Sequence, residues 1–447
     1  MATASTAAAT VANRLALFPV STSIQNNSLT IAGYELAALA DEYGTPLYVY
    51  DRATMDASVA KYRQALKRYY PSKSEITYAG KAFLCKAIAG WAERLNLWMD
   101  CTGSGEISVA VAGNVPREKI LAHGVNKSSA DLAAALELAG TIVVDNLTEL
   151  QRLANLIANT QSSNPRFPNL WLRLQPGLAV ATHHKHTQTG QRDSKFGMTT
   201  EEVIEAAHIC RSKGLPFNGI HFHLGSNFRE PEPLASASAI ALGLAKEIGL
   251  GDVWDFCPGG GWSVAYHEDE LPQPDVDAYV RVITENVIER CQALGLSLPT
   301  LHLEPGRSLV ARAGVAIYRL GVVKRRGERT WLLVDGGMTD SPRHALYGSK
   351  YSCLVATGLD RELTERVSIA GPYCESGDVL IEDLSMPEIH EGELIAIPVS
   401  GAYHLSMSSN YNGARRPAVL WLEPDSVRLI IQRETIEELY QRDLSLT

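Results

Sequence analysis

Short apolar runs alternate with helix-length segments through most of this 447-residue chain, and this alternation restricts the fold more than any other feature. The runs end in small or polar residues, and the segments between them carry apolar residues at helical spacing. Eight such alternations predict an α/β protein with a closed, parallel (β/α)8 barrel, while an open doubly wound sheet is the alternative. The predicted strands are 76–79, 97–101, 120–123, 142–145, 170–174, 219–223, 253–257 and 300–303.

The pattern changes after residue 310, where strand-like runs follow one another with few helical intervals. This change predicts a mainly β C-terminal domain. We therefore expect a barrel domain at 45–310, a β domain at 311–447, and an N-terminal segment, 1–44, that contributes to the β domain. The strand-like runs are 315–323, 330–334, 354–357, 367–370, 394–399, 418–421 and 427–432.

Composition excludes several classes of function. A net charge of −9 with no basic run argues against a nucleic-acid surface, and no apolar run approaches the length of a membrane span. The seven cysteines lack CxxC pairs, which favours reduced thiols in a cytoplasmic enzyme and no metal site. The Ala/Ser/Thr-rich first 30 residues are compatible with a transit peptide, but they hold a single arginine, and we favour a partly ordered, bacterial-type N-terminus.

Lys81 follows the first predicted barrel strand and lies between small residues, ahead of an apolar helix. An amine in this place can form a Schiff base with a carbonyl cofactor. A strand-end lysine that extends to water is the plainer interpretation of the same residue. The other strand ends decide between the two, because a parallel barrel builds its active site from the loops at the carboxyl ends of its strands.

Three more strand ends carry residues suited to one cofactor. The glycine triplet Gly259, Gly260 and Gly261 follows strand 7, where barrels bind phosphate. His223 is the last residue of predicted strand 6 and alternates with His221, so only one of the two should face the barrel mouth, where an imidazole can stack on a flat ring. Glu304 follows strand 8, and a buried carboxylate there needs a partner, either a protonated ring nitrogen or Arg307.

An amine, a phosphate loop, a stacking imidazole and a buried carboxylate together indicate pyridoxal phosphate. A carboxylate beside the ring nitrogen keeps that nitrogen protonated, which makes the ring a strong electron sink. This chemistry suits reactions that form a full carbanion, decarboxylation above all.

The residues also carry a resemblance that covers nearly the whole chain. The sequence resembles the diaminopimelate decarboxylases, of the alanine-racemase-like class of pyridoxal phosphate enzymes. This resemblance implies removal of CO2 from meso-diaminopimelate to give L-lysine, and a head-to-tail homodimer with shared active sites. The motifs that carry it are YAGKA (78–82), TGxxxSKFG (189–197), HFHLGS (221–226), GGG (259–261), EPGRS (304–308), GPYCESGD (371–378), GAY (401–403) and SNYN (409–412).

By resemblance, each motif residue takes a role. Lys81 holds the cofactor, Glu304 faces its ring nitrogen, and Cys374 donates a proton to the carbanion. Arg307, Arg343 and Tyr347 bind the distal carboxylate of the substrate, and Glu375 reaches the distal ammonium from the partner subunit. The cofactor-binding set is completed by His223, Ser226, Gly259, Gly260, Gly261, Pro305, Gly306, Arg307 and Tyr411, of which Tyr411 also contacts substrate.

Three other functions remain open at this point. A decarboxylase of the same class could act on D-ornithine, D-lysine or a carboxylated polyamine, although Arg343 and the Cys374-Glu375-Ser376 segment favour a substrate with a distal amino-acid end. An alanine racemase would place a cation, not Glu304, at the ring nitrogen. A pyridoxal-phosphate-binding homeostasis protein would be a single barrel without the large β domain.

Overall fold

A computed structural model describes residues 10–159, 167–178 and 189–446. The chain divides into two compact units. The barrel unit comprises Val59–Ser263 and Pro274–Gly306, and the sheet unit comprises Met1–Ser58, Val264–Gln273 and Arg307–Thr447. The domain limits expected at residues 44 and 310 remain predictions, because a division into compact units does not test which parts of the chain fold independently.

The barrel unit contains eight parallel strands that close on themselves, since the last strand pairs with the first and Leu303 lies opposite Ile76. The predicted (β/α)8 barrel is therefore confirmed, and the open-sheet alternative is wrong. The barrel strands are β5 (Ser74–Ala79), β6 (Trp98–Thr102), β7 (Ile120–His123), β8 (Thr141–Val144), β9 (Asn169–Arg173), β10 (Phe217–His221), β11 (Asp255–Cys257) and β12 (Thr300–Leu303).

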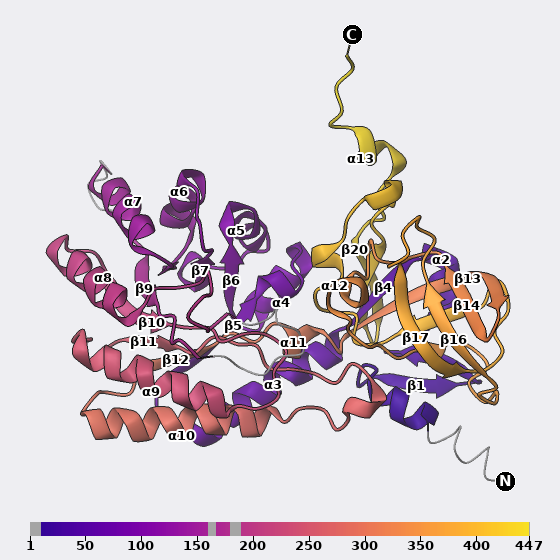
Figure 1. The fold of residues 1–447 in the computed structure, drawn as a ribbon, viewed down its shortest axis with the longest axis horizontal. Helices are drawn as coiled ribbons and strands as arrows, with labels where there is room; N and C mark the ends of the chain where they lie inside the picture. The colour runs from indigo at the N-terminus through magenta and orange to yellow at the C-terminus, as the bar shows by residue number, and fades with distance from the viewer. Residues whose placement is uncertain (1–9, 160–166, 179–188, 447) are drawn as a thin grey trace. The chain divides into compact units, whose positions relative to one another are not determined.

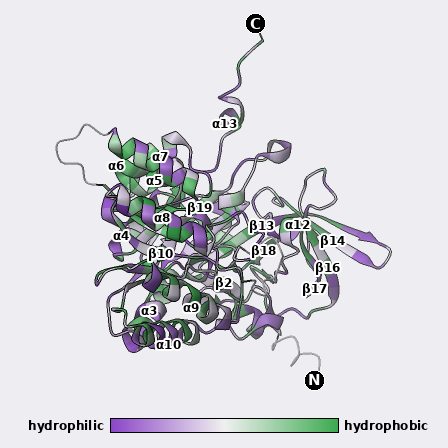
Figure 2. Ribbon diagram, turned by 60° about the vertical axis from the view of Figure 1, so that its left-hand side comes forward, coloured by the Kyte–Doolittle hydropathy of each residue, from purple (hydrophilic) through white to green (hydrophobic). Residues whose placement is uncertain are grey.

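Helices surround these strands (Figure 1). Two of them begin with a reciprocal capping box, Ser128 with Asp131 and Thr199 with Glu202, which satisfies the free N–H groups of the first turn. Hydrophilic and hydrophobic residues alternate along helices such as α10 and α3 (Figure 2), as expected for helices with one buried face. The helices are α3 (Arg52–Tyr69), α4 (Lys86–Arg94), α5 (Gly103–Ala112), α6 (Ser129–Leu138), α7 (Leu147–Ala158), α8 (Thr200–Ser212), α9 (Glu232–Glu247) and α10 (Val276–Leu294).

Side chains fill the barrel interior. Trp171 is fully buried there with Leu121, Val143 and Cys257. Gly219 on the neighbouring strand makes room for it, because a Cβ at residue 219 would lie 2.3 Å from the indole. Packing of this kind makes the barrel a solid core and leaves its strand ends for chemistry.

The sheet unit is mainly β, as predicted, and is built on a nine-stranded sheet whose main path runs β17-β16-β14-β13-β4-β19-β20, with β18 and β15 paired off it. Strand β4 lies inside the range expected for the barrel and pairs with β13 and β19 in this sheet. The strands are β4 (Leu47–Asp51), β13 (Gly314–Arg326), β14 (Arg329–Val334), β15 (Leu354–Val355), β16 (Glu365–Ala370), β17 (Val379–Met386), β18 (Leu394–Ile397), β19 (Ala418–Glu423) and β20 (Ser426–Ile431).

Strand β17 was absent from the predicted set. Glu382 and Asp383 interrupt its apolar run, and Asp383 has a positive φ of 53° beside the shifted register with β16. A short antiparallel sheet, β1 (Thr22–Gln25), β2 (Ser28–Ile31) and β3 (Tyr34–Glu35), also belongs to this unit, followed by α2 (Leu36–Tyr43). Across the described residues, no helix is both long and apolar enough to cross a membrane.

Candidate active site

The barrel unit brings its predicted site residues to one end, where the parallel strands finish. Lys81 lies in a 3-10 turn, η1 (Gly80–Ala82), directly after β5. The ends of β5 and β12 are joined there, because the Ala79 N–H donates to the Pro305 carbonyl at 3.2 Å. A Cβ on Gly306 would lie 3.0 Å from that of Ala79, so the small residues of both motifs allow this close approach.

Lys81 is anchored by an acid that the sequence analysis did not select. Its Nζ lies 2.9 Å from Asp100 Oδ2, at the end of the neighbouring strand β6. The Asp100 side chain is 1% exposed while that of Lys81 is 47% exposed. The amine is therefore held at the rim by a buried carboxylate and stays accessible to a ligand. A strand-end lysine that only extends to water would not require this buried partner.

Glu304 is held between two histidines. His123 Nε2 lies 3.0 Å from one carboxylate oxygen and His221 Nε2 lies 3.1 Å from the other. Burial alone would raise the pKa of Glu304, but the two imidazoles outweigh it and lower that pKa well below its usual value. Burial lowers the pKa of His221 to about 4, so at neutral pH this ring is uncharged and donates its Nε2–H to an ionised carboxylate.

Histidine and glutamate also bind metal ions, and the ligand atoms of these three residues lie within 4.8 Å of one another. Contacts of 3.0 and 3.1 Å between His123, Glu304 and His221 are, however, ordinary hydrogen-bond lengths. The arrangement is thus complete as a clamp that fixes the orientation of one buried carboxylate.

His223 is locked against the glycine triplet. Its Nδ1 accepts a hydrogen bond from the Gly260 N–H at 3.2 Å, so a neutral ring carries its proton on Nε2. Burial, with nearby cations, lowers the pKa of His223 well below its usual value. His221 contacts Glu304, whereas His223 contacts the loop after β11. The two imidazoles at the end of β10 therefore have different partners.

The glycine triplet has no room for side chains. A Cβ on Gly260 would lie 1.9 Å from the Glu304 carbonyl oxygen, and one on Gly261 would lie 2.0 Å from the Gly225 carbonyl oxygen. Gly259 and Gly261 also have positive φ angles of 76° and 103°. The loops after β10, β11 and β12 therefore meet backbone to backbone, and Ser226 lies directly beside this junction.

A further cation lies at the end of β9. Arg173 donates from Nη1 to Asp145 Oδ1 at 3.0 Å, and its guanidinium lies 4.8 Å from the centre of the Phe196 ring. Asp145 also accepts the Gly197 N–H, and the Thr189 hydroxyl donates to the His223 carbonyl at 2.7 Å. These contacts hold the 189–197 motif at the same rim.

The sheet unit gathers the two predicted substrate arginines around shared aromatic rings. Arg307 lies 4.7 Å from the centre of the Tyr403 ring and donates to the Tyr266 hydroxyl. Arg343 lies 5.2 Å from the centre of the Tyr266 ring and 5.5 Å from that of Tyr347. Both arginines are buried.

Arg343 has no acidic partner among the described residues. Its Nε donates to the Tyr351 hydroxyl at 2.9 Å and its Nη2 to the Ser349 hydroxyl at 3.2 Å, and its remaining neighbours are aromatic rings. A buried cation with neutral partners is expensive unless an anion joins it. The residues around Arg343 therefore have the chemistry that suits a carboxylate.

Cys374, Glu375 and Tyr411 lie on the surface of the sheet unit. The Cys374 N–H donates to Asn412 Oδ1 at 3.0 Å, which brings the CES segment beside the SNYN segment that contains Tyr411. Glu375 folds its carboxylate onto its own turn, accepting from the Ser376 hydroxyl and the Gly377 N–H at 3.3 Å.

Sequence reasoning missed Asp100, His123, Arg173, Tyr351 and His404. The first three lie within or at the ends of apolar strands, and a charged or imidazole side chain inside such a run is a signal that the sequence itself contains. Tyr351 and His404 contact Arg343 directly or through one hydroxyl, and no local pattern in the sequence marks them.

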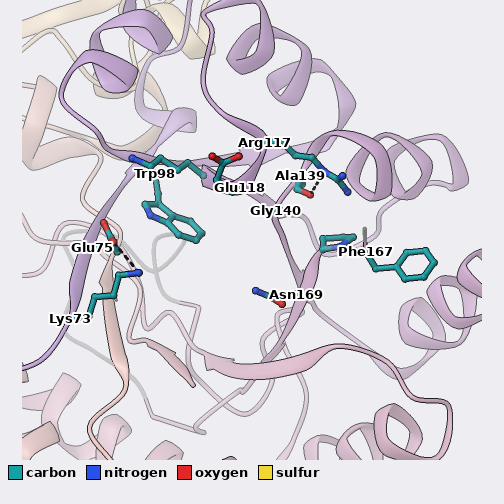
Figure 3. A pocket seen from close by; sticks show the side chains of 11 residues that line it. Lys73, Glu75, Trp98, Arg117, Glu118, Ala139, Gly140, Phe167 and Asn169 are labelled. Atoms are coloured by element: carbon teal, nitrogen blue, oxygen red, sulfur yellow. Dashed lines mark hydrogen bonds and ion pairs between the residues drawn. The ribbon is translucent and has the colours of Figure 1, made fainter. Parts of the chain in front are cut away.

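A separate cavity of about 420 Å³ lies at the opposite end of the barrel (Figure 3). Trp98, Lys119, Gly140 and Asn169 line it, and each stands at or just before the beginning of a strand. The lining contains none of the predicted site residues. The amino ends of barrel strands generally serve stability, and the charged Lys73 and Glu75 in this wall pair with each other.

The residues of the barrel rim fit pyridoxal phosphate. They offer a primary amine at Lys81, an ionised buried carboxylate at Glu304, and a glycine cradle that any Cβ would fill. This donor set suits an aldehyde, a ring nitrogen and a phosphate respectively.

Comparison with known proteins agrees with this chemistry. The pyridoxal-binding domain of the pyridoxal-dependent decarboxylases matches residues 54–311. The diaminopimelate decarboxylase of Bacillus subtilis is 39% identical over 432 residues, which cover 94% of this chain and 96% of that protein. The chain belongs to the diaminopimelate decarboxylase family. It is accordingly a pyridoxal-dependent decarboxylase, and pyridoxal phosphate is its cofactor.

Other members of the family show the same relation. The diaminopimelate decarboxylase of Staphylococcus aureus is 34% identical, over 94% of this chain and 98% of that protein. The crystal structure of diaminopimelate decarboxylase from M. jannaschii in complex with L-lysine is similar with a TM-score of 0.86 at 28% identity, covering 95% of this chain and 98% of that one. The fold and the reaction class predicted from the sequence are thereby confirmed.

Proposed function

We propose that the protein removes CO2 from the D-configured end of meso-2,6-diaminopimelate and releases L-lysine, the last step of lysine biosynthesis. The observation that carries the substrate assignment is the buried Arg343, which has hydroxyl and aromatic neighbours but no acidic partner among the described residues. A substrate with a second carboxylate supplies the missing anion, whereas ornithine and lysine have only an ammonium at that end.

Residues of the barrel unit would hold the cofactor. Lys81 attaches it through Nζ, Glu304 faces the ring nitrogen, and His223 stacks on the ring. Ser226 and the loop Gly259, Gly260 and Gly261 would hold the phosphate, with Pro305 and Gly306 of the barrel unit and Arg307 of the sheet unit as further cofactor-binding residues. Bound pyridoxal phosphate supplies an acceptor for the electron pair of the broken bond.

The chain's own groups set the protonation states that this chemistry needs. The clamp of His123 and His221 keeps Glu304 ionised and fixed in direction, which favours a protonated ring nitrogen. Asp100 keeps the Lys81 amine at the rim. Hydrogen bonds hold these side chains in place before any substrate binds, as a preorganised electrostatic frame requires.

Residues of the sheet unit would orient the substrate. Arg307, Arg343 and Tyr347 bind its distal carboxylate, Glu375 binds the distal ammonium, and Tyr411 contacts substrate and phosphate. Cys374 donates the proton that replaces CO2 at the reacting carbon. Fixing the L end in this way leaves the D-end carboxylate as the group that can leave.

We also propose a homodimer in which Cys374 and Glu375 serve the active site of the partner subunit. Exposure of the CES segment, together with its hydrogen bond to Asn412, supports this assignment, since the segment is ordered by the SNYN motif and faces outward. A cytoplasmic location fits the seven free thiols of the chain.

The test is CO2 release by purified, cofactor-loaded protein. Meso-diaminopimelate is run beside D-lysine, D-ornithine, a carboxylated polyamine and L-lysine, and the amino-acid product is identified. We expect release from meso-diaminopimelate with L-lysine as product. Release from one of the other compounds and none from meso-diaminopimelate would assign the protein to a different substrate of the same reaction class.

A further inference from the structure

Two buried charges of the sheet unit, Asp340 and Arg343, are joined by a continuous series of side-chain hydrogen bonds. The Arg343 Nε–H donates to the Tyr351 hydroxyl at 2.9 Å, and that hydroxyl lies 2.8 Å from His404 Nε2. The other ring nitrogen, His404 Nδ1, lies 3.3 Å from the Tyr48 hydroxyl, which lies 3.0 Å from Asp340 Oδ2. All five residues are buried.

The two ends fix the direction of every bond in this series. A guanidinium can only donate, so the Tyr351 oxygen accepts from Arg343 and its own proton must go to His404 Nε2. The Tyr48 hydroxyl lies 3.0 Å from the Asp340 carbonyl oxygen and 3.0 Å from Asp340 Oδ2, and both oxygens can only accept when the carboxylate is ionised, so Tyr48 donates to Asp340 and its own oxygen is available to His404. His404 is therefore a neutral imidazole that carries its proton on Nδ1.

The other forms of the ring leave a donor unsatisfied. With a proton on His404 Nε2, the Tyr351 oxygen would face two N–H groups, and its own hydroxyl proton would have no acceptor among the described residues. A buried donor without a partner is unfavourable. Burial and the nearby charges of Arg343 and Arg307 also lower the pKa of His404 well below its usual value, which keeps the ring uncharged.

The series leaves part of the Arg343 guanidinium for a ligand. Of its five N–H groups, one is used by Tyr351 and one by Ser349 among the described residues, which leaves three. A guanidinium held at two points presents the rest of its planar fork in one orientation, as bidentate binding of a carboxylate requires.

We propose that His404 and Tyr351 are positioning residues that select for a carboxylate at the distal end of the substrate, acting through the orientation of Arg343. This inference rests on the proposed function, which places the distal carboxylate at Arg343. Neither residue touches the substrate in this account. Their effect is on recognition of the carboxylate and not on the bond that breaks.

The chain offers a conservative variant and a matched control. In His404→Gln, an amide oxygen can accept from Tyr351 and the amide N–H₂ can donate to Tyr48, so the direction of the series is kept. His404→Leu and Tyr351→Phe interrupt it. Tyr318→Phe is the control, because the Tyr318 hydroxyl contacts Asp340 and Tyr48 in the same core but reaches Arg343 only through Tyr48 and His404, and Tyr48 keeps its acceptors on Asp340 when Tyr318 is replaced.

Two measurements separate recognition from stability. In the first, KM and kcat are measured with meso-diaminopimelate; in the second, calorimetry compares the binding of L-lysine with that of 1,5-diaminopentane, which lacks the carboxylate. We expect Tyr351→Phe and His404→Leu to raise KM about tenfold with kcat nearly unchanged. In calorimetry, their preference for L-lysine over 1,5-diaminopentane should fall about tenfold, which corresponds to about 1.4 kcal/mol. His404→Gln and Tyr318→Phe should stay close to the unmodified protein.

An equal rise in KM in Tyr318→Phe, or an unchanged preference for L-lysine in both interrupting variants, would overturn the proposal. Nitrogen-15 NMR of histidine-labelled protein gives a readout that needs no turnover. We expect a proton on Nδ1 of His404. A proton on Nε2, or on both nitrogens, would refute the proposed directions of the hydrogen bonds. Because the NMR and calorimetric results do not depend on CO2 release, failure of the positioning role is distinguishable from failure of the proposed reaction.

Discussion

The clamp on Glu304 makes a quantitative prediction for His221→Phe. Phenylalanine keeps the ring but removes the Nε2–H that donates to Glu304 Oε2 at 3.1 Å, so of the two imidazoles of the clamp the carboxylate retains that of His123. Loss of a hydrogen bond to a buried charge costs roughly 1.5–3 kcal/mol. At 1.36 kcal/mol per pKa unit, the pKa of Glu304 should rise by about one to two units.

The sign of the pH effect follows from the direction of the shift. The pKa of Glu304 is depressed in the folded protein, so the carboxylate is ionised at neutral pH, and the support that we propose it gives to cofactor binding is lost as pH falls through that pKa. Raising the pKa in His221→Phe should therefore move the acid limb of cofactor affinity to higher pH, by about one to two units. The assay is the dissociation constant of pyridoxal phosphate, measured by equilibrium dialysis across a pH series.

His302→Phe is the matched control for this experiment. His302, on β12 and two residues before Glu304, is another fully buried imidazole of the barrel, and its Nε2 lies 3.3 Å from Asp255 Oδ1, so its acidic partner is Asp255 and not Glu304. We expect its acid limb to match that of the unmodified protein. An unchanged limb in His221→Phe, or an equal displacement in both variants, would refute the clamp.

Three further predictions test other parts of the account. Lys127 donates to Glu149 Oε1 at 2.8 Å in a buried pair. Lys127→Met should therefore lower the free energy of unfolding, measured by urea titration, by about 3–5 kcal/mol, and the double variant with Glu149→Leu should recover most of that loss. Equal losses of unfolding free energy in the single and double variants would contradict this. Cys374→Ala should lower kcat by roughly 10²–10⁴-fold with KM nearly kept, as expected for loss of a proton donor, and turnover at the level of the unmodified protein would exclude Cys374 from the mechanism. Inactive Lys81→Ala and inactive Glu375→Ala subunits should regain activity when mixed under conditions of proven exchange, and no recovery would argue against shared sites.

Most of the barrel was predictable because its signal is local. Each strand is a short apolar run, each helix has its own amphipathic pattern, and the closure of eight such units places their carboxyl ends together. Lys81 and Glu304 could therefore be assigned to one rim although they lie at opposite ends of the barrel sequence. The partners of Glu304 could not be predicted, because the direction of a side chain at a strand end depends on the residue at which the strand finishes. Strand β10 ends at His221 and not at His223.

The sheet unit was less predictable for a different reason. Tyr48, Asp340, Arg343, Tyr351 and His404 form one series of hydrogen bonds, yet they come from segments far apart in the chain, including β4, whose neighbours β13 and β19 follow it by more than 250 residues. No periodicity links such residues. Strand β17 was missed because two acidic residues interrupt the apolar run on which a strand prediction depends.

The role of Lys81 is tested by identifying the lysine that carries the cofactor. Cofactor-loaded protein is treated with borohydride, which fixes the cofactor to its amine, then digested and mapped by mass spectrometry. The account predicts the added mass on the peptide that contains Lys81, and its absence after Lys81→Ala. The added mass on another lysine, such as the buried Lys127, or on no lysine, would contradict the assignment of the rim after β5 as the catalytic site.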